Sequence, residues 1–401
     1  MPANFLHGVE TIDVDNGSRP VREVKSAVTL LAGTAPAGPV NTPTLVLSET
    51  DIAQFLPANG APMGNHTIPR ALRAIFNQRN ATVIVVNVSK DGLDTAVAAD
   101  IIGGVDAAGK RTGLKLAADC YNLFGYFPKM LIAPGFCQLA GVAAEQVVQA
   151  NAVGAYTLID APVGATVAQV IGGRGPSGTI HFETSSRRAI LCYPHVRAYD
   201  TWARAEALQP LSQFAAGVIG RKDNDNGYWW SPSNTEILGI TGLERPLTAR
   251  IDDPQSEVNV LNEAGVVTVF NSFGTGFRLW GNRSAAFPTS TALDNFIAVG
   301  RTKDMIDEAI RYNSLQFSDH PVSQGLIDSL VMTTKSFFNI KIGQGALLGG
   351  DAWFNPKRNP QAQLANGQVL ISYRFTPPPP MERLTYESEL TSEYLVNLKS
   401  A

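Results

Sequence analysis

Residues 68–88, IPRALRAIFNQRNATVIVVNV, contain the alternation that decides the fold. The first part predicts a helix over residues 68–80, because its apolar side chains recur at helical spacing: Ile68, Leu72, Ile75 and Phe76. The second part, Thr82–Val88, is apolar almost throughout and rich in valine. Such a run is typical of a strand that is covered on both faces, as in a parallel sheet between layers of helices.

The same alternation of short apolar runs and helical stretches recurs across residues 26–240. Another helix is predicted over residues 143–152, and further buried strands are predicted over residues 27–32, 130–134, 156–159 and 189–193. We therefore predict an α/β domain over residues 26–240, built on a mainly parallel sheet.

The pattern changes to an α+β domain over residues 241–376. Residues 257–270 are expected to form two strands around a turn, and residues 293–317 and 324–338 are expected to be helical. The stretch over 369–376 alternates, and one face of the predicted strand carries Val369, Ile371, Tyr373 and Phe375. The overall fold class is thus mixed, with an α/β domain followed by an α+β domain.

Both ends of the chain are expected to be extended arms. The first, residues 1–25, contains a short strand-like stretch with Val9, Ile12 and Val14, followed by the turn-forming residues 15–20. The second, residues 377–401, begins with four prolines that form a stiff spacer. Its tail contains the apolar residues Leu384, Tyr386, Leu390 and Leu395.

An arm of this kind can add a strand to the sheet edge of another copy. Two such arms in each subunit would link subunits head to tail, and head-to-tail contacts build open helical arrays unless a ring closes. The alternative is that both arms fold back onto their own domains.

Composition argues against several classes of protein. The 401 residues carry a net charge of -3, so the overall positive charge of a nucleic-acid-binding protein is absent. No apolar run approaches the length of a membrane-spanning helix, and no secretory signal is expected. The three cysteines are widely spaced, which favours reduced, partly buried thiols over a disulfide framework or a zinc site.

The motifs for enzymatic chemistry are incomplete. Residues Gly104–Lys110 nearly match a phosphate-binding loop, but Arg111 stands where Ser or Thr is needed, and the preceding residues 93–102 are predicted to be helical. The five histidines are scattered, so no metal site is expected. A nucleotide-binding enzyme remains the alternative of a different class. The aromatic cluster Tyr228-Trp229-Trp230 is interpreted as packing between the two domains.

An ordered set of short motifs resembles one family along nearly the whole chain. These motifs are residues 5–10 (FLHGVE), 17–21 (GSRPV), 33–36 (GTAP), 102–106 (IGGVD), 112–114 (TGL), 131–136 (LIAPGF), 227–234 (GYWWSPSN), 355–360 (NPKRNP), Leu364, Gly367, 373–380 (YRFTPPPP) and 382–384 (ERL). In this order they resemble the contractile tail sheath proteins of phages.

The resemblance implies a structural protein without a cofactor. Sheath subunits of that family form stacked hexameric rings around a tail tube and contract to drive the tube through a cell envelope. The implied partners are other copies of the chain, the tail tube protein, and the baseplate and tail terminator proteins, with no direct nucleic-acid contact or membrane insertion. The implied location is the virion, assembled in the host cytoplasm. The sheath of a headless bacteriocin or another bacterial injection system remains an alternative.

The resemblance also assigns roles to particular residues. Both arms would add strands to neighbouring subunits, and the strands that receive them would lie in residues 258–270 and 369–375. On these strands, the contact residues would be Val267, Val269, Ile371 and Tyr373. Lys335 and Lys341, which flank the end of a predicted helix, are the candidates for contact with the tube.

Overall fold

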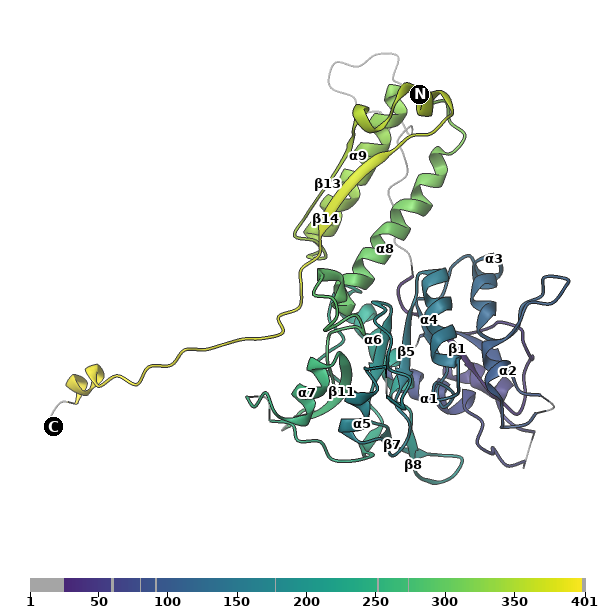
Figure 1. Cartoon of the computed structure of the whole chain (residues 1–401), viewed down its shortest axis with the longest axis vertical. Coiled ribbons are helices and arrows are strands. Elements are labelled where there is room, and N and C mark those ends of the chain that lie inside the picture. Colours follow the sequence, from purple (N-terminus) through teal and green to yellow (C-terminus); the bar gives the residue numbers. More distant parts are fainter. Residues whose placement is uncertain are drawn as a thin grey trace, which may run out of the picture.

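In the computed structural model, the chain forms a large body, a narrow projection and an extended C-terminal arm (Figure 1). The structure describes residues 25–398 except 59, 60, 80, 91, 177, 251 and 273. We use "body" for residues 25–296, "projection" for residues 297–376 and "C-terminal arm" for residues 381–398. The predicted N-terminal arm, including Val9, Ile12 and Val14, lies outside the described residues.

The body is organised around a nine-stranded sheet. Six neighbouring strands of this sheet run parallel, and antiparallel strands continue it at both ends. In spatial order the strands are β2 (Thr44–Val46), β3 (Thr82–Asn87), β1 (Val28–Gly33), β4 (Met130–Ile132), β5 (Tyr156–Asp160), β6 (Ala189–Cys192), β11 (Val266–Ser272), β12 (Gly276–Trp280) and β9 (Thr235–Glu236). A smaller antiparallel sheet consists of β10 (Ile240–Leu243), β7 (Val196–Asp200) and β8 (Ala205–Gln209).

Helices cover both faces of the parallel strands, as the continuous apolar runs predicted. On β1, Leu31 packs with α1 (Ile68–Gln78) and α6 (Leu211–Asn226), whereas Leu30 packs with α2 (Ala98–Ile102) and α4 (Val142–Val153) on the opposite face. The remaining helices of the body are α3 (Cys120–Phe124), α5 (Val167–Gly172) and α7 (Glu257–Glu263). Side chains alternate across a strand, so a strand covered on both sides is apolar at nearly every position.

The predicted domain boundary at residue 240 does not match the sheet. Strands β11 and β12 come after this position in the chain, yet they pair into the sheet of the body. The prediction of two strands over 257–270 is also wrong in its first half, which forms α7. Val258 and Leu261 are the buried residues there, and their spacing of three is helical.

The projection consists of two long helices and a hairpin-like sheet. Helix α8 (Ile297–Ser314) begins against the body and extends away from it, and α9 (Gln324–Gly343) runs back beside it (Figure 1). Strands β13 (Gly349–Phe354) and β14 (Ile371–Thr376) pair antiparallel over α9, and the short helix α10 (Gln361–Ala365) lies in their connection. The alternating strand predicted at the end of the chain is therefore confirmed.

Helix α8 approaches the body closely at Gly300. A Cβ atom at this position would lie 2.1 Å from the Tyr156 hydroxyl and 2.8 Å from the Asp294 carbonyl oxygen. Only glycine fits without moving the helix away from the body, so this residue fixes how closely the base of the projection is seated.

Two predictions from composition can be compared with the structure. Cys120, Cys137 and Cys192 are free, as predicted, and they are buried rather than partly buried. Among the described helices, none is both long and apolar enough to cross a lipid bilayer.

Candidate assembly interface

The two-stranded sheet of the projection has one apolar face. Residue pairs across β13 and β14, such as Ala352 with Tyr373 and Gly350 with Phe375, share this face. They pack against Phe338 of α9, which is fully buried, in a small core separate from that of the body. This core holds the sheet to α9 and leaves the opposite face and the outer edges of the two strands for other contacts.

Each strand of this sheet is paired on one side within the described residues, so each has one edge without a strand neighbour there. Tyr373 is fixed in place because its hydroxyl donates a 2.8 Å hydrogen bond to Asp307 of α8. Burial, together with this bond to a carboxylate, raises the pKa of Tyr373. This hydrogen bond links β14 to α8, and the backbone edge of β14 that has no strand neighbour is the kind of edge to which an extended segment can add a strand.

The four residues predicted to receive an arm fall into two different environments. Ile371 and Tyr373 lie on β14, and their role as recipients stays a prediction. Val267 and Val269 lie on β11, between β6 and β12, and are buried. Val267 pairs with Cys192 of β6 and Val269 pairs with Leu279 of β12, so each already has one strand neighbour, and their role as recipients also stays a prediction.

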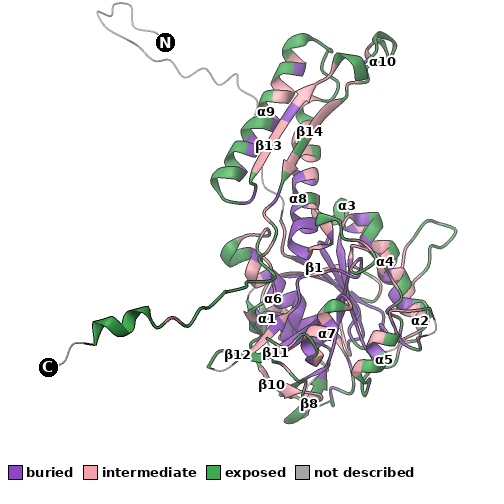
Figure 2. Cartoon of the chain, turned by 60° about the vertical axis from the view of Figure 1, so that its left-hand side comes forward, coloured by how far each residue is buried: buried purple, intermediate pink, exposed green. Residues whose placement is uncertain are grey.

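Apart from its first residues, the C-terminal arm extends away from both the body and the projection (Figure 2). The described residues of the arm are extended and form no strand. A short 3-10 helix spans Glu393–Asn397. Its apolar side chains face solvent: Leu384, Tyr386, Leu390 and Leu395 are 56%, 84%, 101% and 63% exposed. A chain segment with this many exposed apolar groups is suited to burial against a partner.

The two lysines proposed to contact the tube have opposite environments. Lys335 is exposed, and its ammonium lies 2.9 Å from Asp351 of β13, where its hydrogen bond lowers the pKa of the carboxyl. Lys341 is 2% exposed and cannot reach a partner, so its assignment is wrong. Its ammonium lies 5.4 Å and 5.7 Å from the ring centres of Tyr228 and Trp229.

Lys341 thus joins the end of α9 to the aromatic cluster of the body. The cluster was predicted to pack between two domains, and these contacts show such packing for Tyr228 and Trp229, whereas Trp230 is 50% exposed. Phe337 adds a third ring at 5.7 Å, and the side-chain oxygen of Gln344 accepts a 3.0 Å hydrogen bond from the ammonium. The junction is closed by a buried cation among aromatic rings rather than by an apolar contact alone.

Replacing Lys341 with methionine should destabilise the protein by about 1–2 kcal/mol, because methionine keeps the length of the side chain but loses the charge–ring attraction and the hydrogen bond. Lys335→Met is the matched control on the same helix and should leave the melting temperature nearly unchanged, since exposed ion pairs contribute little. Thermal unfolding followed by circular dichroism compares the two variants. An equal decrease in melting temperature in the two variants would contradict the assignment of Lys341 as buried and Lys335 as exposed.

A row of ion pairs binds α8 to the body, and sequence reasoning did not find it. Arg301, Asp304 and Glu308 lie on one face of the helix, at spacings of three and four residues. Each meets an opposite charge from a different element of the body: Asp223 on α6, Arg187 and Arg188 before β6, and Lys129 before β4.

The innermost of these pairs is the most buried. Arg301 donates to both carboxylate oxygens of Asp223 at 2.8 Å and 2.5 Å, and the two side chains are only 4% and 1% exposed. Further out, Asp304 accepts hydrogen bonds from Arg187 at 2.9 Å and from Arg188 at 2.7 Å. Burial lowers the pKa of Lys129 in the outermost pair, against the raising effect of Glu308. This row of ion pairs fixes the projection on the body. Loss of either partner of a buried pair would leave the other charge buried without compensation.

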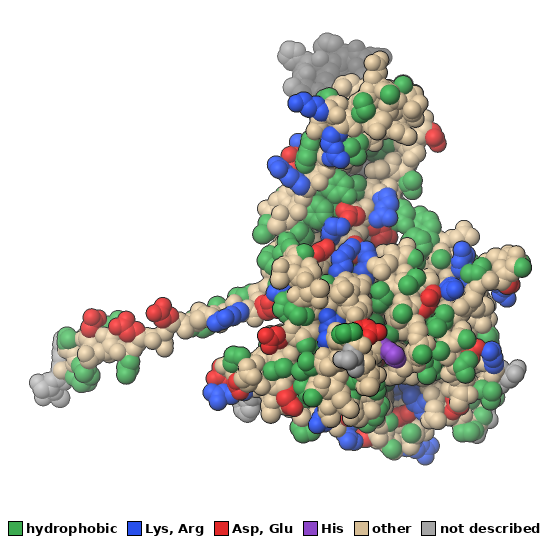
Figure 3. All heavy atoms as spheres, in the orientation of Figure 1, with side chains coloured by type: hydrophobic (Ala, Val, Ile, Leu, Met, Phe, Trp, Pro, Cys, Tyr) green, Lys and Arg blue, Asp and Glu red, His purple; other side chains and the backbone are tan. Residues whose placement is uncertain are grey.

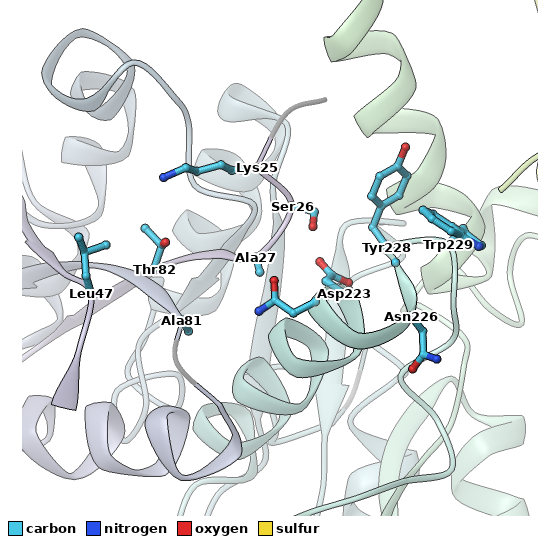
Figure 4. Close-up of a pocket in the computed structure, with 12 residues that line it drawn as sticks. Lys25, Ser26, Ala27, Leu47, Ala81, Thr82, Asp223, Asn226, Tyr228 and Trp229 are labelled. Atoms are coloured by element: carbon cyan, nitrogen blue, oxygen red, sulfur yellow. The ribbon is translucent and has the colours of Figure 1, made fainter. Parts of the chain in front are cut away.

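A cavity of about 640 Å³ lies at the same junction (Figure 4). Its walls include Lys25 at the start of the described chain, Thr82 at the start of β3, and Tyr228 and Trp229 of the aromatic cluster. The carboxylate in its wall, Asp223, is already bound by Arg301. In the part of the chain that the structure describes, no three His, Cys, Asp or Glu residues are arranged to hold a metal ion.

The near phosphate-binding loop has the wrong geometry for nucleotides. It follows α2 rather than a strand, and its backbone closes into a small hairpin between Val105 and Arg111. The side chain of Asp106 accepts the backbone N–H groups of Ala108 and Lys110 at 2.9 Å and 2.8 Å. A phosphate loop must direct such N–H groups at the phosphate, so Asp106 occupies the donors that a nucleotide would need.

Two family models match most of the chain. The phage tail sheath protein central domain matches residues 109–285, and the phage tail sheath C-terminal domain matches residues 289–391. The tail sheath protein of Burkholderia phage BcepMu is 49% identical over an alignment 478 positions long, covering 100% of this chain and 99% of that protein. The division between the two models, near residue 287, lies close to the start of α8.

Solved structures share the fold. The sheath complex of the extracellular contractile injection system PVC, in its contracted state, superposes with a TM-score of 0.71 at 16% identity, covering 98% of this chain and 99% of that chain. A chain of the anti-feeding prophage baseplate gives a TM-score of 0.69 at 18% identity, with coverage of 97% and 100%.

Proposed function

The chain belongs to the phage tail sheath protein family, and from this membership we propose that it forms stacked hexameric rings around a tail tube and contracts to drive the tube through a cell envelope. It is a structural protein rather than an enzyme, and its relatives place it in the tail of the virion. Assembly in the host cytoplasm is part of the proposal.

One observation supports self-assembly most directly: the chain carries a solvent-exposed apolar arm and, elsewhere, a rigid sheet with unpaired edges. The arm is acidic as well as apolar, with the glutamates Glu382, Glu387, Glu389 and Glu393. The projection carries the exposed basic residues Lys335, Lys357, Arg358 and Arg374 around its sheet. Figure 3 displays these opposite charges on the arm and on the projection.

We infer that the arm of one subunit docks on β13 or β14 of its neighbour. Strand addition would satisfy the backbone groups of the arm, and the charges would favour the encounter. Intramolecular docking is less favourable, because the arm leaves the subunit pointing away from its own projection (Figure 1). The N-terminal arm is proposed to link subunits in the same manner.

The other partners of the proposal are the tail tube, baseplate and tail terminator proteins. Lys335 is the remaining candidate for the tube contact, since it is exposed on α9. The 49% identical relative is a phage protein, whereas the structures with the same fold come from other contractile systems. We therefore propose that the chain is the sheath of a phage tail, with the sheath of a headless contractile device as the second candidate. Capsid genes next to the coding gene would distinguish the two.

Electron microscopy of the purified chain tests the proposal. We expect hollow tubes of stacked rings, with six-fold end views, to form from the chain alone or after addition of the tube protein. A control preparation kept at low protein concentration should contain single subunits, because assembly depends on mass action. Persistent single subunits at high concentration, with and without the tube protein, would contradict it.

A further inference from the structure

The root of the C-terminal arm is held to the body before the arm becomes free. Pro377 is buried, Pro378 and Pro380 are partly covered and Pro379 is exposed, so the linker starts against the subunit and lies along its surface. From Met381 onward, every described residue is exposed except Thr391, which is partly covered. Although Glu382 is exposed, its carboxylate forms an ion pair with Arg283 of the body.

The contact of Glu382 is a two-point ion pair. Arg283 donates from Nε to one carboxylate oxygen at 3.0 Å and from Nη2 to the other at 2.5 Å. The two residues are far apart in the sequence and lie in different parts of the molecule. A planar guanidinium that meets a carboxylate at two points fixes its orientation as well as its position.

Arg283 is itself held in one orientation. Its third nitrogen donates a 2.6 Å hydrogen bond to Asn295, which is 1% exposed. Its guanidinium lies 3.6 Å from the ring centre of Phe296 and 4.7 Å from that of Phe287. The arginine is therefore pre-organised by the body, and it loses little freedom when the glutamate binds.

We propose that Arg283 is a positioning residue that sets the direction in which the C-terminal arm leaves the subunit. The free part of the arm then begins at Arg383, and residues 383–398 can reach at most about 55 Å. An arm aimed from a fixed root has a higher effective concentration at one site on a neighbour than an arm that samples all directions. This inference rests on the proposed role of the arm in linking subunits.

The first test uses single subunits, so its result does not depend on whether the chain assembles. A nitroxide label is placed on Leu384→Cys, next to the root, or on Leu395→Cys, near the far end. The native cysteines are buried and will not compete for the reagent under native conditions. Glu382→Gln removes the ion pair while leaving Arg283 packed between its rings.

We expect Glu382→Gln to narrow the electron paramagnetic resonance spectrum of the label at 384 and to leave that at 395 unchanged. Glu387→Gln is the matched control, since it removes the same charge from the arm beyond the root, and it should change neither spectrum. If the label at 384 is equally mobile with and without Glu382, the ion pair does not hold the root in solution and the proposal is overturned.

The second test measures assembly in the full chain without labels. Glu382→Gln should slow polymer growth, followed by light scattering, about fivefold more than Glu387→Gln does, the size expected for losing one partly exposed ion pair. Arg283→Lys, which keeps the charge but cannot bind at two points, should give an intermediate rate. Equal or faster growth of Glu382→Gln relative to Glu387→Gln would contradict a directing role, whereas absence of polymer in the wild type would contradict the proposed function instead.

Discussion

A chain that ends at Pro380 should fold normally and fail to build long tubes. Removing residues 381–401 deletes the exposed apolar side chains of the arm but none of the buried residues of the body. Burial of a leucine side chain against a neighbour contributes about 1.5–3 kcal/mol, so losing Leu384 and Leu390 alone should weaken each contact at least tenfold. We expect the fraction of protein that sediments as polymer to fall by about that factor or more.

Two controls accompany this truncation. Circular dichroism should give the same melting temperature for the truncated and full-length subunits, since the arm contributes little to the fold of its own chain. Val163→Ser, which changes an apolar side chain that is 61% exposed on the body, should assemble as the wild type does. Tubes of normal length from the truncated chain would show that the arm does not link the subunits.

Replacement of Arg301 by methionine should cause the largest loss of stability among the substitutions considered. The change leaves the carboxylate of Asp223, which is 1% exposed, without its partner in a buried environment. Breaking one side of a buried ion pair costs about 3–5 kcal/mol. Urea denaturation of single subunits, followed by tryptophan fluorescence, measures this loss as a shift in the midpoint.

The double variant Arg301→Met with Asp223→Leu isolates the reason for that loss. It removes both charges and fills the site with apolar groups, so most of the stability should return. Lys303→Met is the exposed control on the same helix. In its ion pair the side chain of Lys303 is 46% exposed and that of Asp307 is 26% exposed, so its loss should lower the free energy of unfolding by less than about 1 kcal/mol. A loss in Arg301→Met no greater than that in Lys303→Met would refute the buried-pair interpretation.

The parts of the fold that sequence predicted well are those governed by local periodicity. The helix predicted over residues 68–80, which the structure describes as α1 over Ile68–Gln78, and the buried strand that follows it have apolar patterns that only one kind of element satisfies. The strand predicted over 257–263 was wrong, because this segment fits two patterns. Val258 and Val260 have the spacing of one face of a strand, whereas Val258 and Leu261 have the spacing of one face of a helix. Only the second pair is buried in the structure.

The interface residues were harder to predict, because their roles depend on partners distant in the sequence. Lys341 looks exposed at the end of an amphipathic helix, yet the aromatic rings that cover it come from residues 228 and 229. The charges at Arg301, Asp304 and Glu308 do share one helical face, which was a usable signal. Their partners on three separate elements could not be identified without the tertiary fold.

Because α8 is one unbroken helix, a rotation at its base moves its far end by a larger distance. Its base is clamped on the body by charges, and its 18 residues extend about 27 Å without a break. A tilt of about 10° at the base would carry the tip about 5 Å, which is close to the spacing between neighbouring strands in a sheet. A small rotation of the body would thus be magnified into a displacement of the projection as large as one strand position.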